Sequence, residues 1–477
     1  MRLGPVRRAL KRLKMKPIRL IVPGCLVLLA GCSLSSTYLR PELPAGPHWS
    51  TAAAGGAAQA SNDHWWLAFG DANLDKLVSD VIGRNNEVLI AAANAYPARL
   101  QADIAAHALL PKLDGQVGGS TSQSLNDKVA SSSWSASTSV SYEIDLWGKL
   151  AAKRDKADFE ASATAEDYEN ARLLAIAGTV DAYFTIAHAN QSLASAETSL
   201  DHAKQTRALV RAQVAAGAVS YLDLKQAEQK VEELAAAVST RKQERLVLRN
   251  ALVGLLNGAS NPVPEPQRLP SKKLPPIQAG LPADLLARRP DLRAAEARLR
   301  AMLKNVDETR ASFYPAISLT GTLGTGGEQL LAFISNPVAR LGANAALSFL
   351  NFKDMKLQVA VSRAQYEKEV LRFRATLLTA FSEVANSLGA RADYAERVQR
   401  LHNVLAAAQE IEQLHETRYR SGAIRLTTWL EAQEGRRAAE TALADARLAQ
   451  LLNESKLYRI LGGSAARSGP DGRSTKK

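Results

Sequence analysis

The side chains that most often do chemistry in proteins form no catalytic arrangement in this sequence. The seven histidines have no spacing typical of metal ligands, and His415 with Glu416 lacks the second histidine of a zinc-binding helix motif. The stretch GTLGTGG at 321–327 lacks the strand-to-helix context of a dinucleotide-binding loop, and four methionines are too few for a copper-type cluster. We therefore expect no enzyme active site, no metal site and no bound cofactor.

Covalent lipid attachment is expected at Cys32. Residues 1–31 combine eight basic side chains with the apolar stretch LIVPGCLVLLAG, which is too short to span a bilayer as a helix and is typical of an export signal. The residues LAGC at 29–32 match the lipobox of bacterial lipoproteins. We predict a lipoprotein signal peptide over 1–31 and, on Cys32, a diacylglycerol and an N-acyl chain such as palmitate. The alternatives are an ordinary cleaved signal and a buried cysteine. Cys25 would leave with the signal, so no internal disulfide is expected.

The positive charge is concentrated at the two ends of the chain. Of the net charge of +13, eight units belong to residues 1–31 and three to residues 464–477, which leaves residues 32–463 near +2. A nucleic-acid-binding surface would need this charge within the folded part of the chain. We therefore exclude nucleic acid as a partner, and we expect the polar tail 464–477 to be disordered.

The sequence contains an internal duplication with an offset of 204–206 residues. The stretch ALLPKL around Pro111 matches SFYPAI around Pro315, and AAGAVSYLDLKQAE around Gly217 matches RSGAIRLTTWLEAQE around Gly422. A proline-rich linker lies between the copies, since prolines suit neither helix interiors nor central strands. The predicted segments are an acylated N-terminal segment 32–62, a first repeat 63–258, the linker 259–282 and a second repeat 283–463.

Each repeat is expected to hold a shorter helix, a two-stranded hairpin, a very long helix, a glycine turn and a returning helix. The long segments contain no proline, and they are rich in good helix formers. They are too charged for lipid, so they must pack on one another in water as coiled-coil hairpins; a single extended rod is the alternative. The predicted long helices span about 149–216 and 353–421, and the returning helices about 220–257 and 426–461. Pro97 predicts a kink in the first shorter helix.

Four segments alternate between apolar and polar residues, which is the period of a strand with two different faces. In WSASTSVSYEIDLW, the even positions from Trp134 to Leu146 are mostly apolar, while the odd positions hold serines, Glu143 and Asp145. We expect the even positions to face lipid and the odd positions to line a watery lumen; a half-buried hairpin in a soluble domain is the alternative. Four strands cannot close a barrel, so three chains would supply twelve. The predicted strands span about 113–125, 134–147, 316–325 and 341–352.

Taken together, these features resemble the outer membrane factor family, which comprises the TolC and OprM type channels, and specifically the NodT-like lipoprotein branch of that family. The matching stretches are YLRPELPAGPHW, WWLAFGDANLDKLV, RRPDLRAAEARLRA, ASFYPAISLTGTLG and the two glycine turns. The resemblance implies a mainly helical homotrimer in which long antiparallel coiled-coil hairpins form a periplasmic tunnel below a twelve-stranded transmembrane barrel. It implies a lipid-anchored protein of the outer membrane, a periplasmic adaptor and an inner-membrane transporter of the RND type as partners, and a role as a passive exit duct for drugs or other small toxic compounds.

The resemblance also implies a gate at the periplasmic end of the tunnel, where the turns at Gly217 and Gly422 converge. In the family, a tyrosine near the second turn links to an aspartate after the first, and these fall on Tyr419 and Asp223. The acidic position around the aperture falls on Glu431, with Glu434 one turn further on a similar face. Three-fold symmetry would multiply each acid into a ring that attracts cations. Plain packing for the tyrosine and a solvated helix face for the acids are the alternatives.

Two other functions remain open from the sequence. A type I secretion exit for proteins uses the same architecture. A periplasmic coiled-coil adaptor or structural lipoprotein without a pore would explain the helices and Cys32, but it would not explain four amphipathic strands at matching repeat positions.

Overall fold

A computed structural model describes residues 35–41, 64–126, 130–261, 263–272, 274, 288–328, 337–347 and 350–463. Cys32, most of residues 32–62, part of the linker and the tail 464–477 lie outside the described residues. The chain divides into two compact units. A sheet unit is built from Met1–Thr37, Ala106–Lys153 and Lys304–Ser362, and a helical unit from Tyr38–Ala105, Arg154–Leu303 and Arg363–Lys477.

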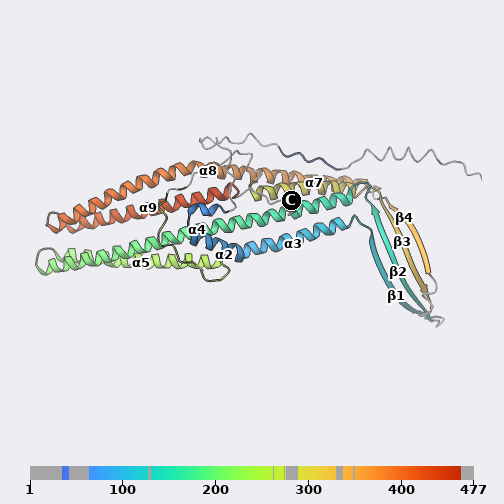
Figure 1. Cartoon of the computed structure of the whole chain (residues 1–477), viewed down its shortest axis with the longest axis horizontal. Helices are drawn as coiled ribbons and strands as arrows, with labels where there is room; N and C mark the ends of the chain where they lie inside the picture. The colour runs from blue at the N-terminus through green and yellow to red at the C-terminus, as the bar shows by residue number, and fades with distance from the viewer. Residues whose placement is uncertain are drawn as a thin grey trace, which may run out of the picture. The chain divides into compact units, whose positions relative to one another are not determined.

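The sheet unit contains one antiparallel sheet to which both repeats contribute. Its strands are β1 (Lys112–Gln123), β2 (Ala130–Ile144), β3 (Ala316–Gly327) and β4 (Pro337–Ala346). They lie side by side in the order β1-β2-β3-β4, so the pairing of β2 with β3 joins the first repeat to the second (Figure 1). Strands β1 and β4 each have one edge without a partner strand in the described sheet.

The strand register collects the apolar residues on one face of the sheet. One cross-strand row on this face is Leu113–Val140–Gly321–Leu341, and the next residue along each strand belongs to the polar row Asp114–Ser139–Thr322–Arg340. The apolar side chains are open to the surroundings: Leu323 is 63% exposed and Leu341 94% exposed. A contiguous apolar surface of this kind marks a site that contacts lipid or protein.

Strand β2 differs at both ends from its predicted bounds of about 134–147. This strand starts at Ala130 because Ser131, Ser132 and Ser133 continue the pairing with β1, and it ends at Ile144. The expectation that Asp145 belongs to the polar strand face is therefore wrong. Its carboxylate instead accepts the backbone N–H groups of Leu150 (3.1 Å) and Ala151 (2.8 Å), and so satisfies donors in the first turn of the following helix.

Strand β4 also differs from its prediction, which placed it at about 341–352. It spans Pro337–Ala346, because these residues pair with β3 from Thr325 back to Ala316. The next long helix already begins at Phe352. The alternation of apolar residues continues past the end of the pairing, which is why the sequence pattern placed this strand too far along the chain.

Long paired helices make up most of the helical unit. Helix α4 (Lys149–Ala215) is followed by α5 (Tyr221–Leu255), which runs back along it, and α8 (Phe352–Arg420) is followed in the same way by α9 (Leu426–Ile460) (Figure 1). Helix α3 (Asn86–His107) continues through Pro97, so the proline does not end it, and the kink stays a prediction. No helix in the described part of the chain has an apolar run that would let it cross a bilayer.

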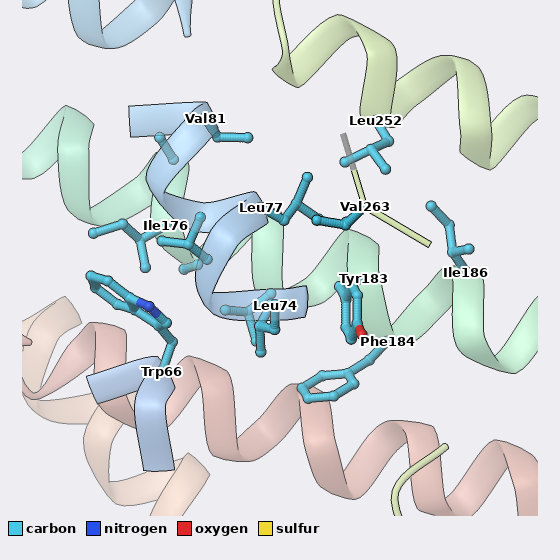
Figure 2. Packing of buried hydrophobic residues seen from close by; sticks show 14 of the residues in the cluster. Trp66, Leu74, Leu77, Val81, Ile176, Tyr183, Phe184, Ile186, Leu252 and Val263 are labelled. Carbon is cyan, nitrogen blue, oxygen red and sulfur yellow. The ribbon is translucent and has the colours of Figure 1, made fainter. Parts of the chain in front are cut away.

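The main core lies where short elements pack against the middle of α4. The short 3-10 helix η2 (Trp65–Phe69) and helix α2 (Ala72–Arg84) direct Trp66, Leu74 and Leu77 toward Ile176, Tyr183 and Phe184 of α4 (Figure 2). Leu252 of α5 and Val263 of the linker complete this cluster. Deletion of such side chains costs about 2–5 kcal/mol each, so this core holds the first hairpin firmly.

The stretch RRPDLRAAEARL is explained by ion pairs around helix α7 (Pro290–Ala311). Arg289 is 8% exposed and donates to Asp291 (2.8 Å) and to Glu383 of α8 (2.9 Å). Glu296, 7% exposed, accepts from the Arg40 guanidinium at 2.8 Å, which ties residues 38–41 to α7. A buried charge needs such partners, so the motif has a structural role here.

Candidate functional site at the helix tips

The tips of both helical hairpins are built by the same glycine turn. Gly217 ends α4 with φ of +69°, and Gly422 ends α8 with φ of +76°. The residue after each glycine donates its N–H back to the helix: Ala218 to the Gln213 carbonyl and Ala423 to the Arg418 carbonyl, both at 2.8 Å. This is the Schellman arrangement, in which glycine takes the left-handed conformation without strain.

The two returning helices start differently. Helix α5 begins with a capping box in which Asp223 Oδ2 accepts from the backbone N–H of Ser220 at 3.0 Å and from its hydroxyl at 2.7 Å. The Ser220 hydroxyl in turn accepts from the N–H of Asp223. Helix α9 begins after Arg425 without a side-chain cap. The first hairpin therefore has the better-satisfied tip, and the carboxylate of Asp223 is occupied locally.

Tyr419 connects the two hairpins at their tips. Its side chain is 4% exposed, its ring stacks on Trp429 with ring centres 5.1 Å apart, and its hydroxyl donates to Gln213 Oε1 of α4 at 2.7 Å. The predicted link from Tyr419 to Asp223 is thus replaced by a bond to Gln213, while Asp223 Oδ2 accepts from Ser220 in the capping box. The buried side chains of this tip cluster come from all four long helices: Val210, Leu224, Ala227, Tyr419, Leu426 and Trp429.

The electrostatic environment keeps Tyr419 a hydrogen-bond donor. Burial raises the pKa of its hydroxyl, and the negative charge of Asp223 raises it further. Asp223 therefore acts on the tyrosine through its charge without a hydrogen bond between them. A neutral tyrosine beside an amide oxygen is a stable donor–acceptor pair.

The two predicted acids have different surroundings. Glu434 of α9 accepts from Lys230 of α5 at 2.8 Å and also pairs with Arg437. These hydrogen bonds, the one from Lys230 first, lower the pKa of Glu434 to about 2. Glu431 is exposed and forms no ion pair with any other described residue. Glu434 is therefore a bridge between the two hairpins, while Glu431 carries the uncompensated charge.

The sequence profile of the family described as "Outer membrane efflux protein" matches the chain over residues 77–258 and 281–463. The chain belongs to this family. The outer membrane efflux protein profile thus matches both repeats, each of which ends just after its returning helix.

Similar proteins cover almost the whole chain. The pyoverdine export outer membrane protein OpmQ of Pseudomonas aeruginosa is 31% identical, and the match covers 93% of this chain and 96% of OpmQ. The toluene efflux pump outer membrane protein TtgC of Pseudomonas putida is also 31% identical, over 91% of this chain and 93% of TtgC. The outer-membrane channel OprN has a similar structure, with a TM-score of 0.83 and 25% identity over 91% of this chain and all of OprN. These relatives are outer membrane channel and efflux components.

Two partners at the outer membrane efflux protein's tips were not predicted from its sequence, namely Gln213 and Lys230. Tyr419 lies 206 residues from Gln213, and Glu434 lies 204 residues from Lys230. Both separations equal the repeat offset within one residue. The two hairpins are copies that lie side by side, so residues at corresponding positions along them come into contact. The repeat offset could therefore have predicted these two pairs. Among the described residues, no group of three or more His, Cys, Asp or Glu side chains is placed to hold a metal.

Proposed function

We propose that this protein is the outer membrane exit duct of a tripartite efflux pump and that it works as a passive, non-enzymatic channel. The observation that carries the proposal is the sheet of this efflux family member: one face is apolar and exposed, and the opposite face is lined by serines and threonines. Strands of this kind suit a lipid-facing exterior and a watery lumen. Drugs and other small toxic compounds are the proposed cargo.

The proposed assembly is a homotrimer. Within one chain, β1 and β4 each have an edge without a partner strand, and an open edge in lipid would leave backbone groups unsatisfied. Three copies would close a barrel of twelve strands. We further propose lipid anchoring through Cys32, a periplasmic adaptor that contacts the hairpin tips, and an RND-type inner-membrane transporter that supplies the energy.

The proposed gate consists of the contacts that join the two hairpins of one chain at their tips. The bond between Tyr419 and Gln213 joins α8 to α4, and the bridge between Lys230 and Glu434 joins α5 to α9. Separation of the hairpins would break both, so these contacts favour a closed tunnel. Asp223 supports the gate through its charge, and Glu431 would form an acidic ring that attracts cations.

The experiment is to purify the full chain in detergent, measure the mass of the protein part of the complex, and record its conductance in a planar bilayer. A trimer that conducts without an energy source supports the duct. A monomer that stays soluble once its acyl anchor is removed would contradict it and would favour an adaptor lipoprotein. Accumulation of a fluorescent dye in cells that lack the protein, with protein secretion intact, would separate efflux from type I secretion.

A further inference from the structure

The polar face of the sheet is hydrophilic but nearly neutral. In β2 every second residue from Ser131 to Ser141 is a serine, and β3 continues the surface with Thr320 and Thr322. Hydroxyl groups pair across the strands, as between Ser120 and Ser133 at 2.8 Å. Such a surface offers hydrogen bonds to water and to solutes, but it does not discriminate between them by charge.

Four charged side chains interrupt this neutral surface. Lys112 and Asp114 lie two residues apart on the same face of β1, where their charges offset each other, and Glu143 forms an ion pair with Lys149. The fourth is Arg340, which lies within β4 and is exposed. Arg340 has no ion pair with any described residue. It is therefore the uncompensated charge of the polar face.

The nearest candidate partner for Arg340 within the sheet is out of reach. Asp114 belongs to the same cross-strand row, but it lies on β1 at the other edge of the sheet. Three strand spacings separate them, which is about 14 Å. A direct hydrogen bond or ion pair across this distance is excluded.

Closure of a barrel does not bring a counter-charge to Arg340 either. In a twelve-stranded barrel the strands tilt by about 35–45°. Because of this tilt, a cross-strand row that passes over four strands meets the next copy about four to six residues further along its strand. With that shift, all ten residues of β4 find partners in β1 of the next copy, and Arg340 lies opposite Gly118 or Ser120. The next copy's Asp114 is then about 13–20 Å away along the strand direction.

We propose that Arg340 sets the charge preference of the pore where it passes through the sheet. Three copies would place a ring of positive charge in a passage otherwise lined by hydroxyl groups, and this ring favours anionic solutes over cationic ones. The proposal rests on the proposed function, because it needs the polar face of the sheet to line the pore. It assigns to the sheet a selectivity opposite to that of the proposed Glu431 ring at the hairpin tips.

The size of the effect follows from Coulomb's law and screening. The arginines would act on an ion on the pore axis from roughly 10 Å, in water and with a screening length of about 10 Å at 0.1 M salt. Because three such charges favour chloride and disfavour potassium at the same time, they raise the chloride-to-potassium permeability ratio about five-fold. At 0.01 M salt the screening length grows to about 30 Å, and the effect on the ratio rises to about twenty-fold.

The test is the reversal potential of the reconstituted full-length channel in a potassium chloride gradient. We expect Arg340→Gln to lower the chloride-to-potassium permeability ratio about five-fold at 0.1 M salt, with a larger change at 0.01 M, and Arg340→Lys to keep the wild-type ratio. Thr322→Glu places a carboxylate directly opposite Arg340 while the arginine is retained. This second variant should lower the ratio as well, and Thr322→Gln is its matched control.

The outcomes separate this inference from the proposed function. The absence of ion current in both the wild type and the opened variant Tyr419→Phe would overturn both proposals. A conducting channel whose ratio is the same in wild type and Arg340→Gln would overturn the role of Arg340 and leave the duct intact, whatever the ratio in Thr322→Glu. A loss of ratio in both variants, with retention in Arg340→Lys and Thr322→Gln, is the result expected.

Discussion

The bond between Tyr419 and Gln213 predicts a specific change in gating. Tyr419→Phe removes the hydroxyl that donates to Gln213 Oε1 at 2.7 Å and keeps the ring on Trp429. Because the tyrosine is 4% exposed, the amide oxygen loses a buried donor, and the closed tip loses about 1 kcal/mol per chain. If three copies open together, the loss is about 3 kcal/mol, which raises the ratio of open to closed channels about 150-fold.

The assay is single-channel recording of the reconstituted protein, with open probability as the measured quantity. Tyr183→Phe is the matched control, because Tyr183 is also buried, at 3% exposed, and donates to Asp71 Oδ2 at 2.7 Å in the core around α2. This control should lose at least as much stability, because its acceptor is a carboxylate, and leave open probability unchanged. A double-mutant cycle with Gln213→Met measures the coupling energy between the two side chains directly.

A definite result would refute this reasoning. If Tyr419→Phe and Tyr183→Phe both lower the melting temperature and neither changes open probability, the bond at the tip contributes to stability alone. If Tyr419→Phe opens the channel equally well with Gln213→Met already present, the hydroxyl acts through another group.

Three further predictions concern the ion pairs and the sheet. The pKa of Glu434 is held at about 2, against an ordinary value of 4.5, so its bridge to Lys230 is fully formed above about pH 4.5 and is lost as the pH falls toward 2. Open probability should therefore rise as the pH falls through this range, and it should not rise in Glu434→Gln. A pH series of bilayer recordings measures both. Arg391→Met leaves Glu454, 1% exposed, as an unpaired buried charge and should cost about 3–5 kcal/mol in denaturant unfolding. Leu323→Lys places a charge on the exposed apolar face and should lower outer membrane assembly, at a cost of about 2 kcal/mol or more per chain, measured as the yield of trimer in membranes.

Each of these predictions has a control with the opposite expectation. If the open probability of Glu434→Gln still rises below pH 4.5, Glu434 is not the group responsible for the pH dependence. Arg372→Met breaks an exposed pair and should change stability by less than about 1 kcal/mol, so an equal loss in both arginine variants would contradict the burial argument. Thr322→Lys lies on the polar face and should assemble normally, whereas equal failure of both lysine variants would contradict the assignment of faces.

The sequence alone determined the elements that depend on local periodicity. A run without proline, rich in helix formers, predicts a long helix, and Gly217 and Gly422 predict turns because glycine alone takes the left-handed conformation without strain. Alternation with a period of two predicts strands with two faces. The duplication could be recognised in the sequence because corresponding residues recur at one offset.

Only the tertiary structure decided where elements end and which side chains meet. The end of β2 at Ile144 depends on its pairing with β1 and β3, which no local pattern contains. Gln213 accepts from the hydroxyl of Tyr419 while Asp223 caps its own helix, and this choice of acceptor exists only once the hairpins lie together. Contacts between residues about two hundred positions apart are set by the packing of whole helices, and the sequence contains them only as the offset of its repeat.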